Sequence, residues 1–128
     1  MNTRTAWNDY FTGSPTSTLS KEYGERQTPS VANVYVLNSL FRSITSTSGH
    51  GGALYCSSSV TYLLIESTSF FSIKAYYAGG AIFFTNTNSG QCVLNEVCGY
   101  DCYSTNNNEG QFAYIYVYNA ASSKNYVN

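Results

Sequence analysis

Three acidic residues have the type and spacing closest to catalytic chemistry in this sequence. They are Glu66, Glu96 and Asp101, and the two glutamates are separated by little more than one unit of the repeat described below. Glycoside hydrolysis needs two carboxylates held at a defined separation, so Glu66 and Glu96 are the pair to consider. A solvated face explains the same two residues without catalysis, and Asp101 beside Tyr100 is typical of a turn. We therefore predict no catalytic residues in this chain.

Cysteines and a single histidine offer a second kind of chemistry. The cysteines are Cys56, Cys92, Cys98 and Cys102. Their spacing lacks the Cys-x-x-Cys pair of structural zinc sites, so we predict no bound metal, with or without His50, and no other cofactor. Four cysteines permit two disulfides in three connectivities, and small buried thiols fit equally well. Because His50 precedes a turn and has no marked serine or cysteine beside it, a nucleophilic triad is also excluded.

Composition limits the partners of the chain. Of its 128 residues only 10% are charged, and the formal net charge is -1. The basic residues are scattered and form no stripe along a phosphate backbone, so we expect no nucleic-acid partner. No apolar run reaches the roughly 20 residues of a membrane-spanning helix, and the N-terminal part lacks the features of a signal peptide. Abundant Tyr, Phe, Ser, Thr and Asn favour strands and turns over helices.

An internal repeat is the strongest structural signal. The segment from Gly51 to Cys56 matches the segment from Gly79 to Phe84 at a spacing of 28. Upstream positions repeat at a spacing of 29, namely Val36 with Ile65, Phe41 with Phe70, and Ile44 with Ile73. A weaker third copy starts near Gln91 and ends in Gly110 to Ile115, where the second glycine has become Gln111. Short apolar segments between polar turns indicate strands throughout the repeated region.

A repeat of this length predicts an all-β fold, a right-handed parallel β-helix of about three to four rungs. One such unit cannot bury its own apolar face, whereas stacked units can. We assign residues 28–128 to the β-helix and residues 1–27, which show no repeat, to a flexible or poorly formed lead segment. The pairs Gly51-Gly52 and Gly79-Gly80 are predicted to be structural turn residues, since the Lys-Ser/Thr of a phosphate loop does not follow them.

The repeat also predicts which side chains point outward. Aligning the copies on their glycines gives two interior columns, Cys56 with Phe84 and Ile115, and Leu54 with Ile82 and Ala113. The column between them, Tyr55 with Phe83 and Tyr114, then forms an outward ladder of aromatic rings. Such rings either cover the sheet or present flat faces to a sugar or a protein, so the ladder is our candidate ligand-binding face.

The Gly-Gly-Ala-aliphatic sequence after a Phe-x-x-Ile strand resembles the polymorphic outer membrane protein-like, pectin-lyase-like family of β-helix repeats. The segment from Ser89 to Tyr103, Ser-Gly-Gln-Cys-Val-Leu-Asn-Glu-Val-Cys-Gly-Tyr-Asp-Cys-Tyr, is similar to the trichomonad branch of that family. The resemblance covers roughly residues 27–128. It implies a cell-surface or secreted protein tied to adhesion, and a longer gene product of which this chain is a truncated part.

Together these patterns predict a non-enzymatic surface scaffold for adhesion or carbohydrate binding. Its expected partners are a glycan or a host-surface protein. The alternative is a fragment of a carbohydrate-active, pectin-lyase-like enzyme, or a fragment with no independent function. Exposed strand edges at the open ends of a short β-helix also favour pairing with another chain, so we expect either a larger parent protein or self-association.

Overall fold

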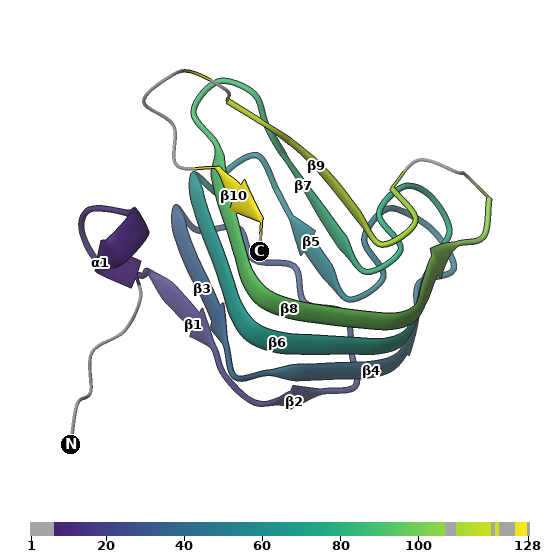
Figure 1. Cartoon of the computed structure of the whole chain (residues 1–128). Helices are drawn as coiled ribbons and strands as arrows, with labels where there is room; N and C mark the ends of the chain where they lie inside the picture. The colour runs from purple at the N-terminus through teal and green to yellow at the C-terminus, as the bar shows by residue number, and fades with distance from the viewer. Residues whose placement is uncertain (1–6, 107–109, 119, 121–124, 128) are drawn as a thin grey trace.

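A computed structural model of the chain shows a parallel β-solenoid of about three turns (Figure 1). It describes residues 7–106, 110–118, 120 and 125–127. The β-helix fold expected from the repeat is therefore confirmed. Among these residues the single helix is α1 (Trp7–Tyr10), which is far too short to cross a membrane.

Each turn of the solenoid has three walls. Wall 1 consists of β1 (Ser17–Leu19), β3 (Asn33–Leu37), the first parts of β6 (Tyr62–Ala75) and β8 (Gln91–Ser104), and β10 (Tyr126–Val127). Wall 2 consists of β2 (Glu22–Tyr23), β4 (Leu40–Thr45) and the second parts of β6 and β8. Wall 3 consists of β5 (Leu54–Cys56), β7 (Ile82–Asn86) and β9 (Ala113–Val117). Every strand pairs in parallel with its counterparts in neighbouring turns, so each turn buries the apolar face of the next.

The strand register follows the spacing in the sequence. In wall 1 the positions that repeat at a spacing of 29 lie side by side, and Val36 is opposite Ile65. In wall 3, Leu54 is opposite Ile82, which in turn is opposite Ala113. Leu54 and Ile82 are fully buried, whereas the aromatic residues between the two interior columns are half-buried. The predicted inward and outward columns of wall 3 are therefore confirmed.

Left-handed residues make the bend between walls 1 and 2. Asn38, Ser67 and Glu96 have φ angles of 48°, 49° and 57°, and they follow one another at a spacing of 29. This backbone region is uncommon for residues other than glycine and is tolerated best by Asn and Asp. A second set within wall 2 has the same spacing and φ angles of 56°, 55° and 55°, and consists of Ser43, Ser72 and Asp101. Each set interrupts the inward-outward alternation of the strand.

Aromatic rings stack through the centre of the solenoid. The ring centroids of Tyr23 and Phe41 are 4.8 Å apart, and those of Phe41 and Phe70 are 4.9 Å apart. The next position in this column is Gly99, which pairs with Phe70 in the strand register. Phe112 enters from the opposite side, and its ring meets that of Phe70 edge-on at 5.7 Å. The Phe112 ring, from the residue just before wall 3, thus fills the space that Gly99 leaves open in wall 2.

The predicted boundary of the solenoid at residue 28 is wrong. Residues 17–19 and 22–23 form β1 and β2, which pair with β3 and β4 as the first rung. Leu19 lies opposite Val36 and Tyr23 opposite Phe41, so these residues continue the interior columns. The first rung has one residue fewer between these two columns than the second, and it lacks the glycine pair. Its repeat is therefore hidden from a search at fixed spacing. Residues 1–6 of the predicted lead segment lie outside the described residues.

A second apolar cluster lies on the outer surface of wall 1. Tyr35, Leu64 and Val93 form one outward column, and all three are buried. Trp7 and Phe11 cover this column from the N-terminal segment, beside wall 1 in Figure 1. The Trp7 ring centroid is 5.9 Å from that of Tyr35, and Phe11 stacks on Tyr62 at 4.6 Å. We call residues 7–16 the strap.

Phe11→Ala is expected to loosen the strap without unfolding the solenoid. The substitution removes the ring that stacks on Tyr62 and contacts Trp7, about 3 kcal/mol of packing, and a helix of one turn has little stability of its own. Trp7 is the single tryptophan, so its fluorescence should shift to the red while the β-sheet circular dichroism stays unchanged. Thr12→Ala, at an exposed neighbouring position, should leave the emission as it is. Loss of the β-sheet signal in Phe11→Ala would contradict the prediction.

Candidate functional site

The predicted ladder of Tyr55, Phe83 and Tyr114 exists, but its rings cover one another. The Tyr55 and Phe83 centroids are 5.4 Å apart with an interplanar angle of 1°, and those of Phe83 and Tyr114 are 5.2 Å apart at 12°. The Arg26 guanidinium lies 5.0 Å from the Tyr55 centroid, and the His50 ring stacks 4.4 Å from Phe83. A sugar stacks on a free ring face, and the faces between the rungs are occupied. The ladder thus presents mainly ring edges to solvent.

The two glycine pairs have clear backbone roles. Gly51 and Gly79 have φ angles of 67° and 73°, which favour glycine. A Cβ on Gly52 would meet the carbonyl oxygen of Gly80, and a Cβ on Gly80 would meet that of Gln111. In each pair the first glycine provides the turn and the second admits the backbone of the next rung.

The strand register separates the three carboxylates that the sequence singled out. Glu66 lies opposite Asn95, and its Oε1 accepts a hydrogen bond from the Tyr35 hydroxyl at 2.9 Å. Glu96 is at the bend between walls 1 and 2, where Ser67 donates to its Oε2 at 3.2 Å. Asp101 lies farther along wall 2. The register places each of these acids in a column of its own, because the two glutamates are one position further apart than the repeat.

The cysteines divide into two kinds of free thiol. Cys56 and Cys92 are buried in the central core, whereas Cys98 is exposed and Cys102 is half-buried. Burial raises the pKa of Cys92 to about 12, and burial together with the neighbouring Cys92 also raises the pKa of Cys56. His50 is elsewhere and accepts a hydrogen bond from the Ala78 amide at Nδ1 (3.1 Å). Among the residues that the structure describes, no three potential ligands gather around a common point.

These buried thiols predict a loss of stability at alkaline pH. A thiol whose pKa rises from about 9 in the unfolded chain to about 12 in the fold keeps its proton when folded and loses it when unfolded. Through Cys92, stability therefore falls between about pH 9 and pH 12, by up to about 1.4 kcal/mol per pH unit, and the raised pKa of Cys56 adds a loss in the same direction. Urea unfolding from pH 7 to 10.5 should show this slope, reduced in Cys92→Ala. Exposed Cys98→Ala should keep the wild-type slope, and equal slopes in both variants would contradict the assignment.

The most exposed aromatic residue among those that the structure describes lies on the outer side of wall 2. Tyr100 is 71% exposed, and Phe71 and Tyr103 are each 37% exposed. The register places Phe71 next to Tyr100, yet their rings meet at 75° with centroids 6.4 Å apart. At this angle Phe71 covers at most one of the two faces of the Tyr100 ring. We call Arg42, Phe71, Lys74, Tyr100, Asp101 and Tyr103 the wall 2 face.

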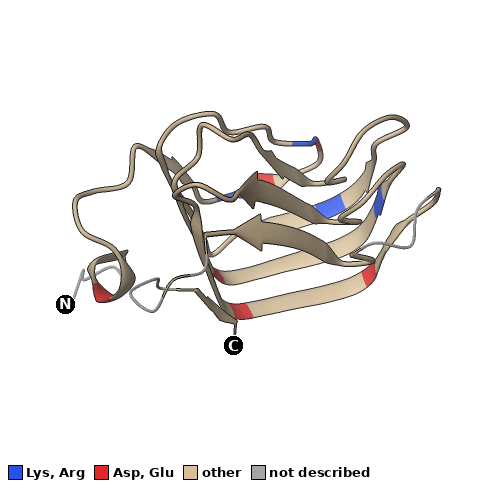
Figure 2. Ribbon diagram, turned by 90° about the horizontal axis from the view of Figure 1, so that it is seen from above, with Lys and Arg blue, Asp and Glu red and all other residues tan. Residues whose placement is uncertain are grey.

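Polar and charged groups surround these rings. Ser72 donates a hydrogen bond to Asp101 Oδ2 at 3.1 Å, and Lys74 Nζ lies 5.5 Å from the Tyr103 centroid. Arg42 forms an exposed ion pair with Glu22 at 2.9 Å. Charged residues are otherwise sparse on the solenoid (Figure 2). The wall 2 face thus combines accessible rings with hydroxyl and carboxylate groups, which is the chemistry of a sugar-binding surface.

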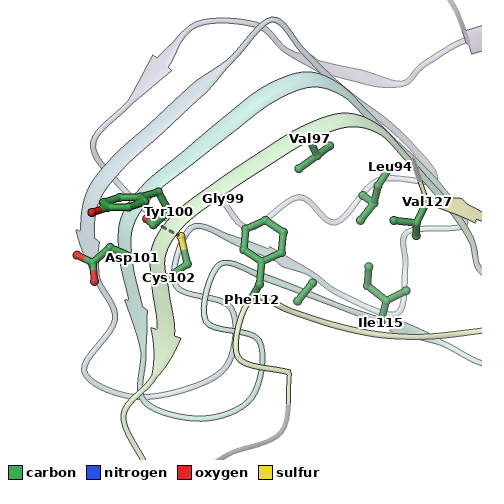
Figure 3. A pocket seen from close by; sticks show the side chains of 10 residues that line it. Leu94, Val97, Gly99, Tyr100, Asp101, Cys102, Phe112, Ile115 and Val127 are labelled. Carbon is green, nitrogen blue, oxygen red and sulfur yellow. Dashed lines mark hydrogen bonds between the residues drawn. The ribbon is translucent and has the colours of Figure 1, made fainter.

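An apolar hollow of about 680 Å³ lies on the inner side of β8, at the last full rung (Figure 3). Leu94 and Val97 line it from β8, and Phe112 and Ile115 face them from the other side. Tyr100 and Asp101 lie at its outer edge, where their side chains point away from Phe112 (Figure 3). The hollow is therefore continuous with the core, and the side chains of Tyr100 and Asp101 project outward from its edge.

Sequence reasoning missed the wall 2 face because it assigned inward and outward positions only to the strand that follows the glycine pair. The left-handed residues Ser72 and Asp101 insert one extra outward position between inward ones. Phe70 is buried and Phe71 exposed, and Ile73 is buried again after Ser72. The signal was available as the inward spacing of three between Phe70 and Ile73, repeated between Phe41 and Ile44.

Comparison with known proteins adds no further information on the site. No protein-family model, curated protein or solved structure matches the chain. The resemblance to polymorphic outer membrane protein-like repeats thus rests on the quoted sequence motifs, and the activity must be argued from the surface itself.

Proposed function

We propose that this chain is a non-enzymatic β-solenoid scaffold that binds carbohydrate at a cell surface through its outward aromatic residues. The observation that carries the proposal is the exposure of Tyr100, a residue that is 71% exposed and lies beside Phe71 and Asp101. An exposed aromatic ring has a large apolar area that water solvates poorly. Its face carries partial negative charge and attracts the C–H groups of a sugar, whereas the sugar hydroxyl groups stay at the edge of the ring. The family resemblance supports the surface location and the role in adhesion.

The ladder supports the proposal in a different way from the one predicted. Its stacked rings stiffen wall 3, because the Phe83 ring contacts that of Tyr55 in the preceding rung and that of Tyr114 in the following one. The binding role passes to the wall 2 face, where the rings are not stacked on one another. Two other partners predicted from the sequence stay predictions: a host-surface protein, and a second copy of the chain joined at the ends of the solenoid.

The test is binding to a glycan array and to host cells, with two sets of substitutions. We expect Phe71→Ala, Tyr100→Ala and Tyr103→Ala combined to abolish binding while changing the melting temperature little, because all three rings are exposed. The matched control combines Tyr55→Ala, Phe83→Ala and Tyr114→Ala, which should lower the melting temperature and retain binding below it. Unaltered binding by the first set would refute the proposal, and depolymerisation of polygalacturonate by the wild-type chain would favour the enzyme.

A further inference from the structure

We propose that the ligand of the wall 2 face is an uncharged oligosaccharide, with one sugar ring stacked on Tyr100 and a sugar hydroxyl donating to Asp101. This inference rests on the proposed function and specifies its ligand. It assigns separate roles to two adjacent residues, one apolar and one polar.

Tyr100 is the ring with a face free to take a sugar. Tyr100 is 71% exposed, and Phe71 meets it at 75° and so covers at most one of its two faces. Tyr103 already has Lys74 5.5 Å from its centroid. The π-electron face carries partial negative charge, which attracts the weakly positive C–H groups on one face of a pyranose ring. The sugar would therefore lie flat against Tyr100 and keep its hydroxyl groups at the edge, where polar side chains are found.

Asp101 is placed to receive one of those hydroxyl groups. Its left-handed backbone, with φ 55°, turns the residue outward between the inward positions Gly99 and Cys102. Ser72 donates one hydrogen bond to Oδ2, whereas an ionised carboxylate can accept about four. The remaining capacity faces solvent beside Tyr100, and a hydrogen bond to an ionised acceptor is about twice as strong as one between neutral groups.

The charges of the surface favour an uncharged ligand over an acidic one. Arg42 is paired with Glu22 at 2.9 Å, so its charge is compensated. Lys74 and Asp101 lie in neighbouring outward rows of the same wall and are opposite in sign. A uronate or sulfate stacked on Tyr100 would thus meet the Asp101 carboxylate without an excess of positive charge to offset the repulsion.

The second ring on β8 indicates a ligand longer than one sugar. Tyr103 follows Tyr100 by three residues on the same strand, a separation of at most about 10 Å. A linear oligosaccharide could contact both rings, whereas a monosaccharide could contact one. We therefore expect affinity to rise with chain length.

Calorimetric titration of the whole chain tests these assignments. The uncharged probes are cellohexaose, mannohexaose and xylohexaose, and the anionic probes are hexagalacturonate and a heparin hexasaccharide. At least one uncharged probe should bind more tightly than both anionic ones, and more tightly than its own monosaccharide. Tyr100→Ala should weaken that binding about tenfold or more, equivalent to ~1.4 kcal/mol, whereas Tyr100→Phe should retain it because the ring stays.

Asp101→Asn separates the carboxylate from the backbone shape. Asparagine tolerates the left-handed conformation and can still accept from Ser72, so the fold should be preserved while affinity falls on the order of fivefold. Tyr116→Ala is the matched control, since Tyr116 is 60% exposed but lies on wall 3. It should bind as the wild type does.

The possible outcomes distinguish the ligand from the function. Binding of hexagalacturonate alone, lost in Tyr100→Ala, would overturn the uncharged ligand and leave the binding surface in place. Wild-type affinity in Tyr100→Ala would overturn the stacking role. If no oligosaccharide binds and host-cell binding survives substitution of the three wall 2 rings, both the inference and the proposed function are wrong.

Discussion

Gly80→Ala is expected to prevent the chain from forming a stable solenoid. A Cβ at this position would overlap the carbonyl oxygen of Gln111 and lie 2.7 Å from the Cα of Tyr103. Both obstacles are backbone atoms of the next rung, so no rotamer change can relieve them and the rungs must separate. We expect a loss of at least about 4 kcal/mol, which is a large part of the roughly 5–15 kcal/mol typical of a folded domain. Thermal unfolding followed by circular dichroism measures the effect.

The matched control is Gly24→Ala. A Cβ on Gly24 would have no heavy atom within 4 Å, and its φ lies outside the left-handed region. This variant should melt within a few degrees of the wild type or slightly above it, because alanine reduces the entropy of the unfolded chain. If Gly80→Ala has the same melting temperature as Gly24→Ala, the close contact between rungs at Gly80 does not limit the stability of the fold.

The same contact explains why the glycine repeat weakens along the sequence. Gly52 is limited by the backbone of Gly80, and Gly80 by that of Gln111. Among the described residues no strand pairs with the outer edge of β9, so no backbone that they supply limits position 111 in the same way. A side chain is tolerated where the constraint ends. The change to Gln111 therefore reflects stacking geometry and not a loss of the fold.

Spacing along the chain predicted the fold because each rung repeats the same positions. Val36 with Ile65 and Leu54 with Ile82 were paired correctly from their spacing in the sequence alone. The first rung was missed because its repeat is one residue shorter between Leu19 and Tyr23 than between Val36 and Phe41. A search at one fixed spacing does not detect a repeat in which the bend between walls 1 and 2 is one residue shorter.

The binding surface was harder to predict than the fold, because it depends on ring orientation. The sequence predicts that Tyr55 and Phe83 point outward, but not that their planes are parallel and nearly in contact. It does not predict that Phe71 meets Tyr100 edge-on. Side-chain torsions decide whether a ring face is covered or free, and those torsions follow from packing between rungs. The strap was missed for a similar reason, since Trp7 and Phe11 belong to no repeat.

Gly99 and Phe112 are expected to behave as one unit in the core. Phe112→Ala alone removes the ring that meets Phe70 edge-on and should cost about 3 kcal/mol, because Gly99 has no side chain to fill the space. Gly99→Phe alone should also destabilise the fold, since even a Cβ at Gly99 would overlap the Phe112 ring.

The double variant Gly99→Phe with Phe112→Ala should recover much of that loss. It restores the regular column, with a phenylalanine above Phe70 as Phe70 stands above Phe41, and an alanine opposite Ala81. Urea unfolding of the four proteins in a double-mutant cycle should give a coupling of at least about 2 kcal/mol. If the losses in the free energy of unfolding of the two single variants add in the double variant, the two side chains do not occupy a shared space. A positive coupling would mean that the interior volume is conserved from rung to rung, whichever wall supplies the ring.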